Sequence, residues 1–423
     1  MRLTTLNRCH RPCLWLALLL CSLTITANAE NSDATLTLNE ALARTLSHNP
    51  QLYQYRFTKE ALEAQRQTSV LRPAMALELD AENFAGSGDT QGFDTAETTL
   101  ALSSVIELGG KRQARVSYAD ARINQAEWEQ QATTLDVLGE LTALYIESLA
   151  TQANIRLAEE SLGLSRSLLK TVKMRSKQGA TPEAEVMRAQ AAVARAEIRL
   201  AAVVEQFERQ KVQLARFWGD TTPAFSTLEG SLFEFGANQG FEQLYARVKT
   251  SPAIQVFASE ARIRDAEVTL ARAGGRSDLT WRAGITRFEE TGDTAFTAGL
   301  SIPLFSNARS SGEVKAALAN RNAVDYARED LLLRVHAQLF EAYSLRKQSI
   351  AAATKTQNVV IPALENALKL TREAYENGRY RYLDLIAAQE ELLATKQAHI
   401  DAASTVLISQ ALIEKLSSEA LNH

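Results

Sequence analysis

The spacing of hydrophobic residues along this chain changes from about 3.6 to 2 and back again. Over residues 36–70 the apolar positions recur every three or four residues, which predicts helices. Leu77 and Leu79 then alternate with acidic residues, which predicts a strand with one apolar face. A polar loop and a second alternating run follow, so we predict a β-hairpin over about 73–107.

This hairpin runs directly into a very long helical pattern at Gly109-Gly110-Lys111-Arg112. The three-to-four spacing continues from there with only tolerable interruptions, which predicts long helices over about 111–218. The junction lacks the earlier glycine and the Ser or Thr of a phosphate-binding loop. We therefore interpret it as a strand-to-helix bend, with Lys111 and Arg112 at a membrane edge.

The whole series restarts about two hundred residues later. Ser251-Pro252 corresponds to Asn49-Pro50, and Asn377-Gly378 to Gln178-Gly179, so the offset falls from 202 to 199. A duplication of this length is a stronger signal than any single motif. The predicted parts are a first repeat (30–218), a linker (219–240) and a second repeat (241–423). In the second repeat we predict a hairpin over about 278–305 and long helices over about 309–418, the first of which runs from about Arg309 to Glu376.

The last predicted helix carries two neighbouring stripes of hydrophobic residues at heptad spacing. One stripe includes Leu393 and Ile400, and the other includes Leu385 and Leu392. A two-stranded coiled coil needs only one such stripe. Two stripes indicate packed neighbours on both sides, as in a ring of helices.

Residues 1–29 have the features of a secretory signal peptide: an arginine-containing start, a short apolar run and an Ala-x-Ala cleavage site. All three cysteines lie in this segment, so the cleaved chain would have no thiol for disulfides, metal ligation or catalysis. Lipid attachment at Cys21 is an open alternative. Loss of Arg2, Arg8 and Arg11 would leave 43 basic and 50 acidic residues, an acidity that argues against nucleic acid as a partner.

The predicted strands of an exported protein are consistent with a membrane sheet. Each is about ten residues long, which suits a tilted transmembrane strand. In a bilayer such a sheet has to close so that every backbone amide is paired, and four strands are too few to close. Several chains would therefore share one barrel. The alternative is that the strands form small hairpins packed on the helices of a soluble periplasmic protein.

The duplication, the two hairpins, the glycine-containing helix turns and the junction together resemble the TolC-like outer membrane efflux proteins. The resemblance covers about residues 36–416, and the run from Glu107 to Arg112 is similar to that of the heavy-metal (CzcC-like) branch. It implies a mainly α fold with β-hairpins and long coiled-coil helices. It also implies a homotrimer that forms a twelve-stranded barrel in the outer membrane and a helical tunnel through the periplasm.

The same resemblance implies the partners and the role. A periplasmic adaptor would join the channel to an inner-membrane, proton-driven pump of the RND class, and outer membrane lipid would surround the barrel. The expected function is an exit duct for heavy-metal cations such as cobalt, zinc, cadmium or copper. Two alternatives stay open: the same duct serving drug efflux or type I protein secretion, and, in another class, a soluble periplasmic coiled-coil adaptor.

Three acidic residues of one predicted strand are candidates for the lumen of the barrel. If Leu77 and Leu79 face lipid, then Glu78, Asp80 and Glu82 face the lumen, where an acidic ring would favour cations. The alternative is that lumen-facing residues are polar without any selective role.

The two helix turns are candidates for a periplasmic gate and for adaptor docking. Gly179 and Gly378 suit helix ends in the left-handed conformation, and the resemblance adds adaptor docking. Arg379, Arg381 and Asp384 could close the tunnel through charge pairs between subunits, the alternative being an ordinary solvated turn.

The sequence shows no arrangement typical of an enzyme or of a tight metal site. The histidines that follow the signal segment are scattered, and no pair has ligand spacing. We therefore expect no catalytic residue, no cofactor and no metal site. A duct needs none, because tight binding would slow transit.

Overall fold

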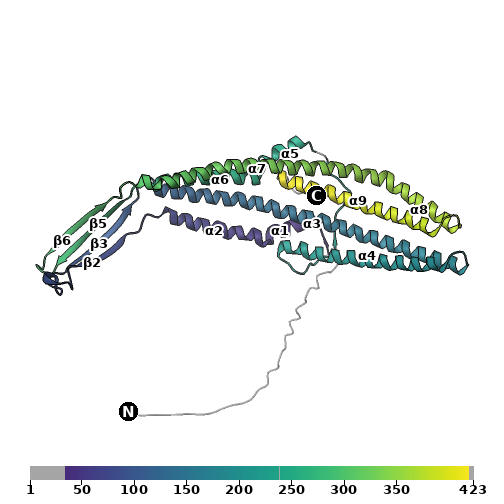
Figure 1. Cartoon of the computed structure of the whole chain (residues 1–423), viewed down its shortest axis with the longest axis horizontal. Helices are drawn as coiled ribbons and strands as arrows, with labels where there is room; N and C mark the ends of the chain where they lie inside the picture. The colour runs from purple at the N-terminus through teal and green to yellow at the C-terminus, as the bar shows by residue number, and fades with distance from the viewer. Residues whose placement is uncertain (1–33, 238, 419–423) are drawn as a thin grey trace, which may run out of the picture.

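The computed structural model describes residues 34–237 and 239–418. The predicted signal peptide, the three cysteines and the alternative of lipid attachment at Cys21 lie outside the described residues. The described chain is elongated: a sheet lies at one end, long helices run along the body, and two helix-to-helix turns lie at the other end (Figure 1).

The two halves of the chain have matching orders of elements. The elements of the first half are β1 (Thr35–Leu36), α1 (Leu38–His48), α2 (Pro50–Val70), β2 (Ala76–Glu82), β3 (Glu97–Ile106), α3 (Lys111–Lys177), α4 (Glu183–Ala215) and β4 (Thr227–Leu228), with short 3₁₀ turns at Gly88–Thr90 and Arg216–Trp218. Those of the second half are α5 (Phe241–Val248), α6 (Pro252–Gly274), β5 (Leu279–Phe288), β6 (Thr294–Ser301), α7 (Ser306–Lys355), α8 (Ile361–Glu376) and α9 (Tyr382–Ser417).

Four strands form one antiparallel sheet in the order β2-β3-β5-β6. Both predicted hairpins are present, and β3 pairs with β5, so the two hairpins become a single sheet. Leu100 of β3 lies opposite both Leu79 and Ile285, which places the alternating apolar residues of three strands on one face. Each of the edge strands β2 and β6 has a neighbour on one side only among the described residues.

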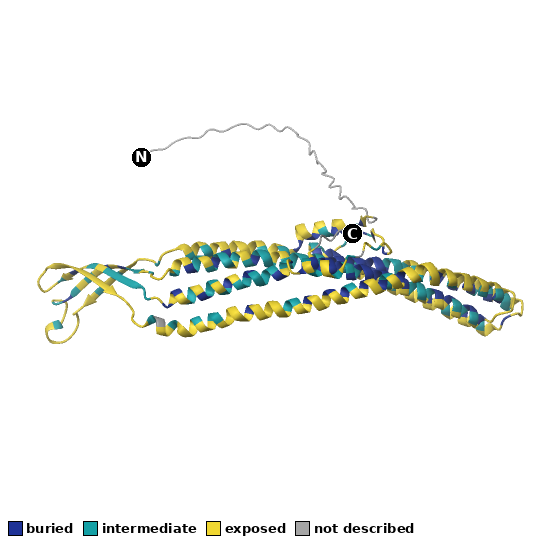
Figure 2. Cartoon of the chain, turned by 90° about the horizontal axis from the view of Figure 1, so that it is seen from above, coloured by how far each residue is buried: buried dark blue, intermediate teal, exposed yellow. Residues whose placement is uncertain are grey.

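The apolar face of this sheet is uncovered by any other part of the described chain (Figure 2). Leu77 is 73% exposed, Leu300 is 74% exposed and Phe296 is 90% exposed. On the opposite, polar face, Ala101 and Thr286 are buried. An exposed apolar surface of this kind marks a contact with lipid or with another protein chain.

α3 is the central helix of the body. Its part nearer the sheet packs against α2 and α6, and its far part packs against α4 and α9. Its 67 residues span roughly 100 Å at about 1.5 Å per residue. Within residues 34–237 and 239–418, no helix is both long enough and apolar enough to span a bilayer.

The long helix predicted from about Arg309 to Glu376 contains a local change of helix type in the structure. A π-helical segment, Thr356–Val360, separates α7 from α8. Pro362 gives the physical reason, because proline has no N–H to donate and its ring collides with the carbonyl four residues earlier. The wider π turn accommodates it. The predicted long helix is therefore present, with one π-helical segment that the sequence did not predict.

The hydrophobic core is concentrated in the middle of the body, as Figure 2 shows. Tyr145 of α3 is 1% exposed there, and its hydroxyl lies 2.7 Å from the carbonyl oxygen of Leu36 and 2.6 Å from that of Glu229. Burial raises the pKa of Tyr145, which keeps the hydroxyl protonated as a donor. This side chain therefore fastens the small β1–β4 sheet to the central helix.

Candidate functional site

The first strand-to-helix junction depends on two consecutive glycines. Gly109 and Gly110 have φ angles of 73° and 74°, in the left-handed region that favours glycine. Gly110 is the N-cap residue of α3. The predicted bend is therefore present, and it is made by the backbone conformation of these two residues.

Charged residues on both sides fix this junction. The Lys111 ammonium donates to a carboxylate oxygen of Asp278 at 2.7 Å, and the Leu108 N–H donates to the other oxygen at 3.1 Å. Arg115 forms a two-pronged ion pair with Glu107. Lys111 thus joins the start of α3 to the residue just before β5, while Arg112 is exposed. Sequence reasoning missed Asp278.

The second junction is made in a different way. Phe305 takes the left-handed conformation, with φ 62°, where the first junction uses glycine. The Ser277 hydroxyl donates to the carbonyl of Pro303 at 2.6 Å and lies 3.0 Å from the Ser306 hydroxyl. The two junctions are therefore equivalent in position but not in mechanism.

The acidic candidates of β2 lie on the polar face of the sheet, as alternation predicts. Glu78 and Asp80 both pair with Arg282 of β5, which sequence reasoning missed. Glu82 lies opposite Glu97 in the register, and the side chain of Asn83 donates to Glu97 at 2.9 Å. The structure thus gives two of the three predicted carboxylates a basic partner.

The two helix turns have the left-handed glycines that the sequence predicts. Gly179 has φ 72° and Gly378 has φ 73°. The N–H of Ala180 donates to the carbonyl of Arg175, and the N–H of Arg379 donates to that of Ala374 in the equivalent way, both at 2.9 Å. Each turn therefore closes its helix with the same hydrogen-bond pattern.

Arg175 connects the two turns, and sequence reasoning missed it. Its guanidinium donates to the carbonyl oxygens of Tyr375 and Glu376, each at 2.7 Å, and to the Thr181 hydroxyl at 3.3 Å. The same group lies 4.8 Å from the ring centre of Tyr375. Both carbonyls belong to the C-terminus of α8, where a cation is favoured. One side chain therefore holds the end of α3 against the end of α8.

Asp384 is paired within its own turn. Its carboxylate accepts the backbone N–H of Arg381 at 3.0 Å and lies 3.5 Å from the side chain of the same residue. These hydrogen bonds, the backbone one first, lower the pKa of Asp384 below its usual value. Arg379 is exposed at the same turn. Of the predicted gate residues, the structure brings together Arg381 and Asp384.

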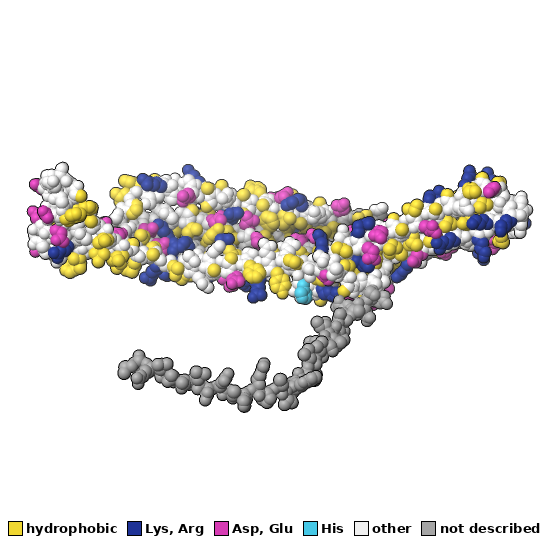
Figure 3. Space-filling view, turned by 90° about the horizontal axis from the view of Figure 1, so that it is seen from below, with side chains coloured by type: hydrophobic (Ala, Val, Ile, Leu, Met, Phe, Trp, Pro, Cys, Tyr) yellow, Lys and Arg dark blue, Asp and Glu magenta, His cyan; other side chains and the backbone are white. Residues whose placement is uncertain are grey.

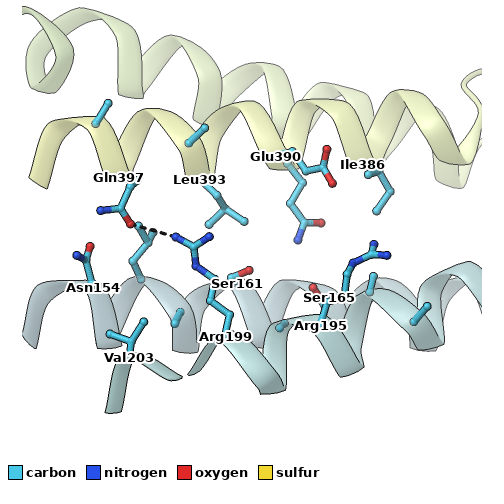
Figure 4. Close-up of a pocket in the computed structure, with 18 of the residues that line it drawn as sticks. Asn154, Ser161, Ser165, Arg195, Arg199, Val203, Ile386, Glu390, Leu393 and Gln397 are labelled. Atoms are coloured by element: carbon cyan, nitrogen blue, oxygen red, sulfur yellow. Dashed lines mark hydrogen bonds between the residues drawn. The ribbon is translucent and has the colours of Figure 1, made fainter. Parts of the chain in front are cut away.

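A groove of about 1220 Å³ lies between α4 and α9, above the central helix (Figure 4). One wall carries Arg188, Arg195 and Arg199 of α4, and small residues of α3 such as Ser161 form the floor. Arg199 donates to the amide oxygen of Gln397 on the facing wall at 3.3 Å. Among the described residues, Arg188 and Arg195 have no carboxylate within ion-pair distance. Arg188 and Arg195 are seven residues apart, and Arg195 and Arg199 are four apart, so all three lie on one face of the helix. This spacing could have been recognised from the sequence.

Basic residues also line α3 near its turn. Arg166, Lys170, Lys173 and Lys177 follow one another at spacings of four, three and four, so they share one face of the helix. Figure 3 shows basic side chains gathered toward this end of the molecule. In the part of the chain that the structure describes, no group of three or more His, Cys, Asp or Glu side chains could hold a metal ion.

Comparison with known proteins identifies a family to which this chain is similar along most of its length. The family model described as "Outer membrane efflux protein" matches residues 41–220 and 245–418. The cobalt-zinc-cadmium resistance protein CzcC of Cupriavidus metallidurans is 27% identical over 309 residues, which cover 71% of this chain and 72% of that protein. The nickel-cobalt-cadmium resistance protein NccC of Alcaligenes xylosoxydans xylosoxydans is 24% identical, over 82% of this chain and 76% of that protein.

A solved structure extends the likeness to the fold. The crystal structure of CusC, described in connection with transmembrane channel formation, superposes with a TM-score of 0.76 over 94% of this chain and 95% of that one, at 16% identity. The helical body, the four-stranded sheet and their order along the chain are therefore those of a TolC-like channel protein. Because the family model covers most of its length in both halves, this chain belongs to the outer membrane efflux protein family.

Proposed function

We propose that this chain forms the exit duct of a tripartite, proton-driven efflux system that exports heavy-metal cations. Family membership makes it an outer membrane efflux channel that extends into the periplasm, and a transport duct rather than an enzyme. The proposal adds the cargo and the partners. The observation that carries the cargo is the similarity to two metal resistance proteins over more than two thirds of the chain.

The sheet supports a shared barrel of three chains. Its strands leave two open edges, and open edges do not persist in a bilayer because their amides would lack partners. Three copies would supply twelve strands, an even number within the range of such barrels. The apolar face with Leu77 and Phe296 would then face lipid.

The helices that border the body support the same assembly. Tyr326, Leu333 and Phe340 form an exposed stripe at heptad spacing along α7, at 74%, 67% and 56% exposure. On the opposite border, α2 exposes Tyr53 and Phe57. Apolar residues at heptad spacing are typical of a helix that packs against another helix. The α7 stripe of one copy would therefore pack against α2 of the next.

The turns and the groove support docking of a periplasmic adaptor. The groove has a floor of small side chains, three arginines on the α4 wall, and Glu390 and Asp401 on the α9 wall, which suits a helix whose acidic residues face α4. The basic face of α3 beside the turn carries the same positive charge as the arginine wall of the groove. The adaptor is therefore expected to bind this end through carboxylates.

Reversing two arginines of the groove tests this docking. Arg195→Glu combined with Arg199→Glu should weaken binding of the system's own adaptor by about 10- to 100-fold, because two attractive contacts become repulsive. Biolayer interferometry with the purified channel measures the affinity. Arg209→Glu is the matched control, an exposed arginine of α4 outside the groove lining. An equal loss for the control would argue against docking in the groove.

Growth on metals tests the cargo. Deleting the gene should lower tolerance to one or more of zinc, cobalt, cadmium, copper and silver in graded plates, and the wild-type gene should restore it. Unchanged tolerance to all five together with new sensitivity to organic drugs would overturn the metal assignment. Heat-modifiable migration of the protein from the outer membrane fraction should accompany the channel function. Its absence would favour a soluble adaptor.

A further inference from the structure

Arg282 crosses a whole strand to reach the acidic residues of β2. It lies in β5, opposite Ser103 of β3, and β3 separates β5 from β2. The Arg282 Nε lies 3.3 Å from a carboxylate oxygen of Glu78, and its Nη2 forms an ion pair with Asp80. One guanidinium therefore connects two carboxylates on the polar face.

Small residues make this crossing possible. Ala101 is 1% exposed, and Gly284 packs so closely that an added Cβ would lie 2.7 Å from the Cβ of Ala101. The Ser103 hydroxyl donates to Glu78 at 2.6 Å. Glycine, alanine and serine in the middle strands thus leave a shallow floor along which the arginine side chain extends. The contact is made by the sheet itself and needs no loop.

The ion pairs change the charge that the polar face presents. Glu78 and Asp80 alone would contribute two negative charges per chain, and Arg282 leaves one. The three side chains are 39–43% exposed, so they are accessible to water and to ions. A conducting pore requires cations to be attracted but bound weakly enough to leave. Two free carboxylates at adjacent positions would retain a divalent cation more strongly than a pair already engaged by a guanidinium.

We propose that Arg282 is a specificity-determining residue of the duct, which lowers the cation affinity of the belt formed by Glu78 and Asp80. The inference rests on the proposed function, because it requires the polar face of the sheet to line the lumen. Arg282 acts through its charge and through the position in which it holds the two carboxylates. Removing it leaves a belt that prefers cations more strongly and releases divalent ions more slowly.

The test compares single-channel recordings of purified trimers in planar bilayers. Under a KCl gradient, Arg282→Gln should raise the permeability ratio of potassium over chloride by about sevenfold, because one elementary charge across roughly 7 Å of water favours potassium about threefold and disfavours chloride by the same factor. Micromolar to millimolar zinc or cobalt should then reduce the potassium current of the variant more than that of the wild type. An unchanged reversal potential and unchanged block would overturn the proposal.

A matched control uses the other arginine of β5. Arg287 lies five residues further along the strand, so it belongs to the opposite face, and it pairs with Glu289 at 2.8 Å. Arg287→Gln makes the same change of charge and should leave the reversal potential at the wild-type value. A shift as large as that of Arg282→Gln would show that selectivity does not depend on the polar face, and would contradict the proposal.

A second variant separates charge from sheet stability. Glu78→Gln combined with Arg282→Gln restores the net charge of the belt to one negative charge per chain, and it should return the permeability ratio toward the wild-type value. If the effect of Arg282→Gln came only from a loosened sheet, the double variant would not recover. If Arg282→Gln does not insert, Glu78→Gln alone should lower the permeability ratio, and no change would sink the proposal. A wild-type trimer that inserts but never conducts would instead refute the duct itself.

Discussion

Valine in place of Gly109 should destabilise the folded chain by about 3 kcal/mol and sharply reduce the amount of protein in the outer membrane. A residue with a Cβ pays about 1–2 kcal/mol for the left-handed conformation that Gly109 holds. The new Cβ would also lie 2.3 Å from Cγ and 2.7 Å from Cβ of Arg276, and such overpacking costs about 1–3 kcal/mol. Thermal unfolding followed by helical circular dichroism measures the loss.

Gly110→Val is the matched control for this prediction. Gly110 has the same backbone conformation, but nothing lies within 4 Å of an added Cβ, so only the strain of about 1–2 kcal/mol applies. Combining Gly109→Val with Arg276→Gly, which removes both the Cγ and the Cβ of Arg276, should relieve the overpacking and bring the first loss down toward that of the control. Equal losses for the two single variants would show that Arg276 does not restrict this junction.

The features that the sequence predicted are those that depend on neighbours in the chain. Alternation placed Glu78 and Asp80 on the polar face, and the glycines at 179 and 378 marked the helix ends, because a strand face and a left-handed cap are set by a few adjacent residues. The interruption near Pro362 was also local. It was missed because the periodic pattern continues across a single extra residue in a π turn.

The features that the sequence did not predict are contacts between the two halves. Asp80 and Arg282 are 202 residues apart, Arg175 and Tyr375 are 200 apart, and Arg199 and Gln397 are 198 apart. These separations lie within one residue of the offset of the internal duplication, which falls from 202 to 199 along the sequence. Long side chains such as those of Arg282 and Arg175 therefore reach between near-equivalent positions of the two halves, although equivalent strands are not neighbours in the sheet.

This match suggests how such contacts can be found from sequence. A long basic side chain and a complementary group at about the duplication offset are candidates for contact across one intervening element, as Arg282 and Asp80 are across β3. Lys111 and Asp278, 167 residues apart, do not follow the rule. Their contact depends on β3 pairing with β5, which ties the end of one hairpin to the start of the other. Only the sheet register could have predicted it.

Methionine in place of Arg175 should separate the two helix turns and raise the conductance of the channel. The substitution keeps most of the length of the side chain but removes its charge-assisted hydrogen bonds to the carbonyls of Tyr375 and Glu376, each worth about 1.5–3 kcal/mol. If closed turns outnumber open ones by 99 to 1, the closed arrangement is favoured by a free energy of roughly 2.7 kcal/mol. Losing hydrogen bonds worth this much would make the open and closed arrangements similarly populated. Single-channel recordings should show larger or more frequent openings.

Distances between the turns give a second measure that does not depend on conduction. The three native cysteines all lie within residues 1–29, so Lys177→Cys and Asn377→Cys can carry spin labels without competing thiols once that segment is removed. The distance distribution should broaden and lengthen in Arg175→Met. Arg379→Met, which removes an exposed arginine of the same end, should leave it unchanged. Because lysine offers a single ammonium in place of the planar guanidinium, Arg175→Lys should give an intermediate distribution. A wild-type distribution in Arg175→Met would mean that the turns are held together by packing, with Arg175 incidental to it.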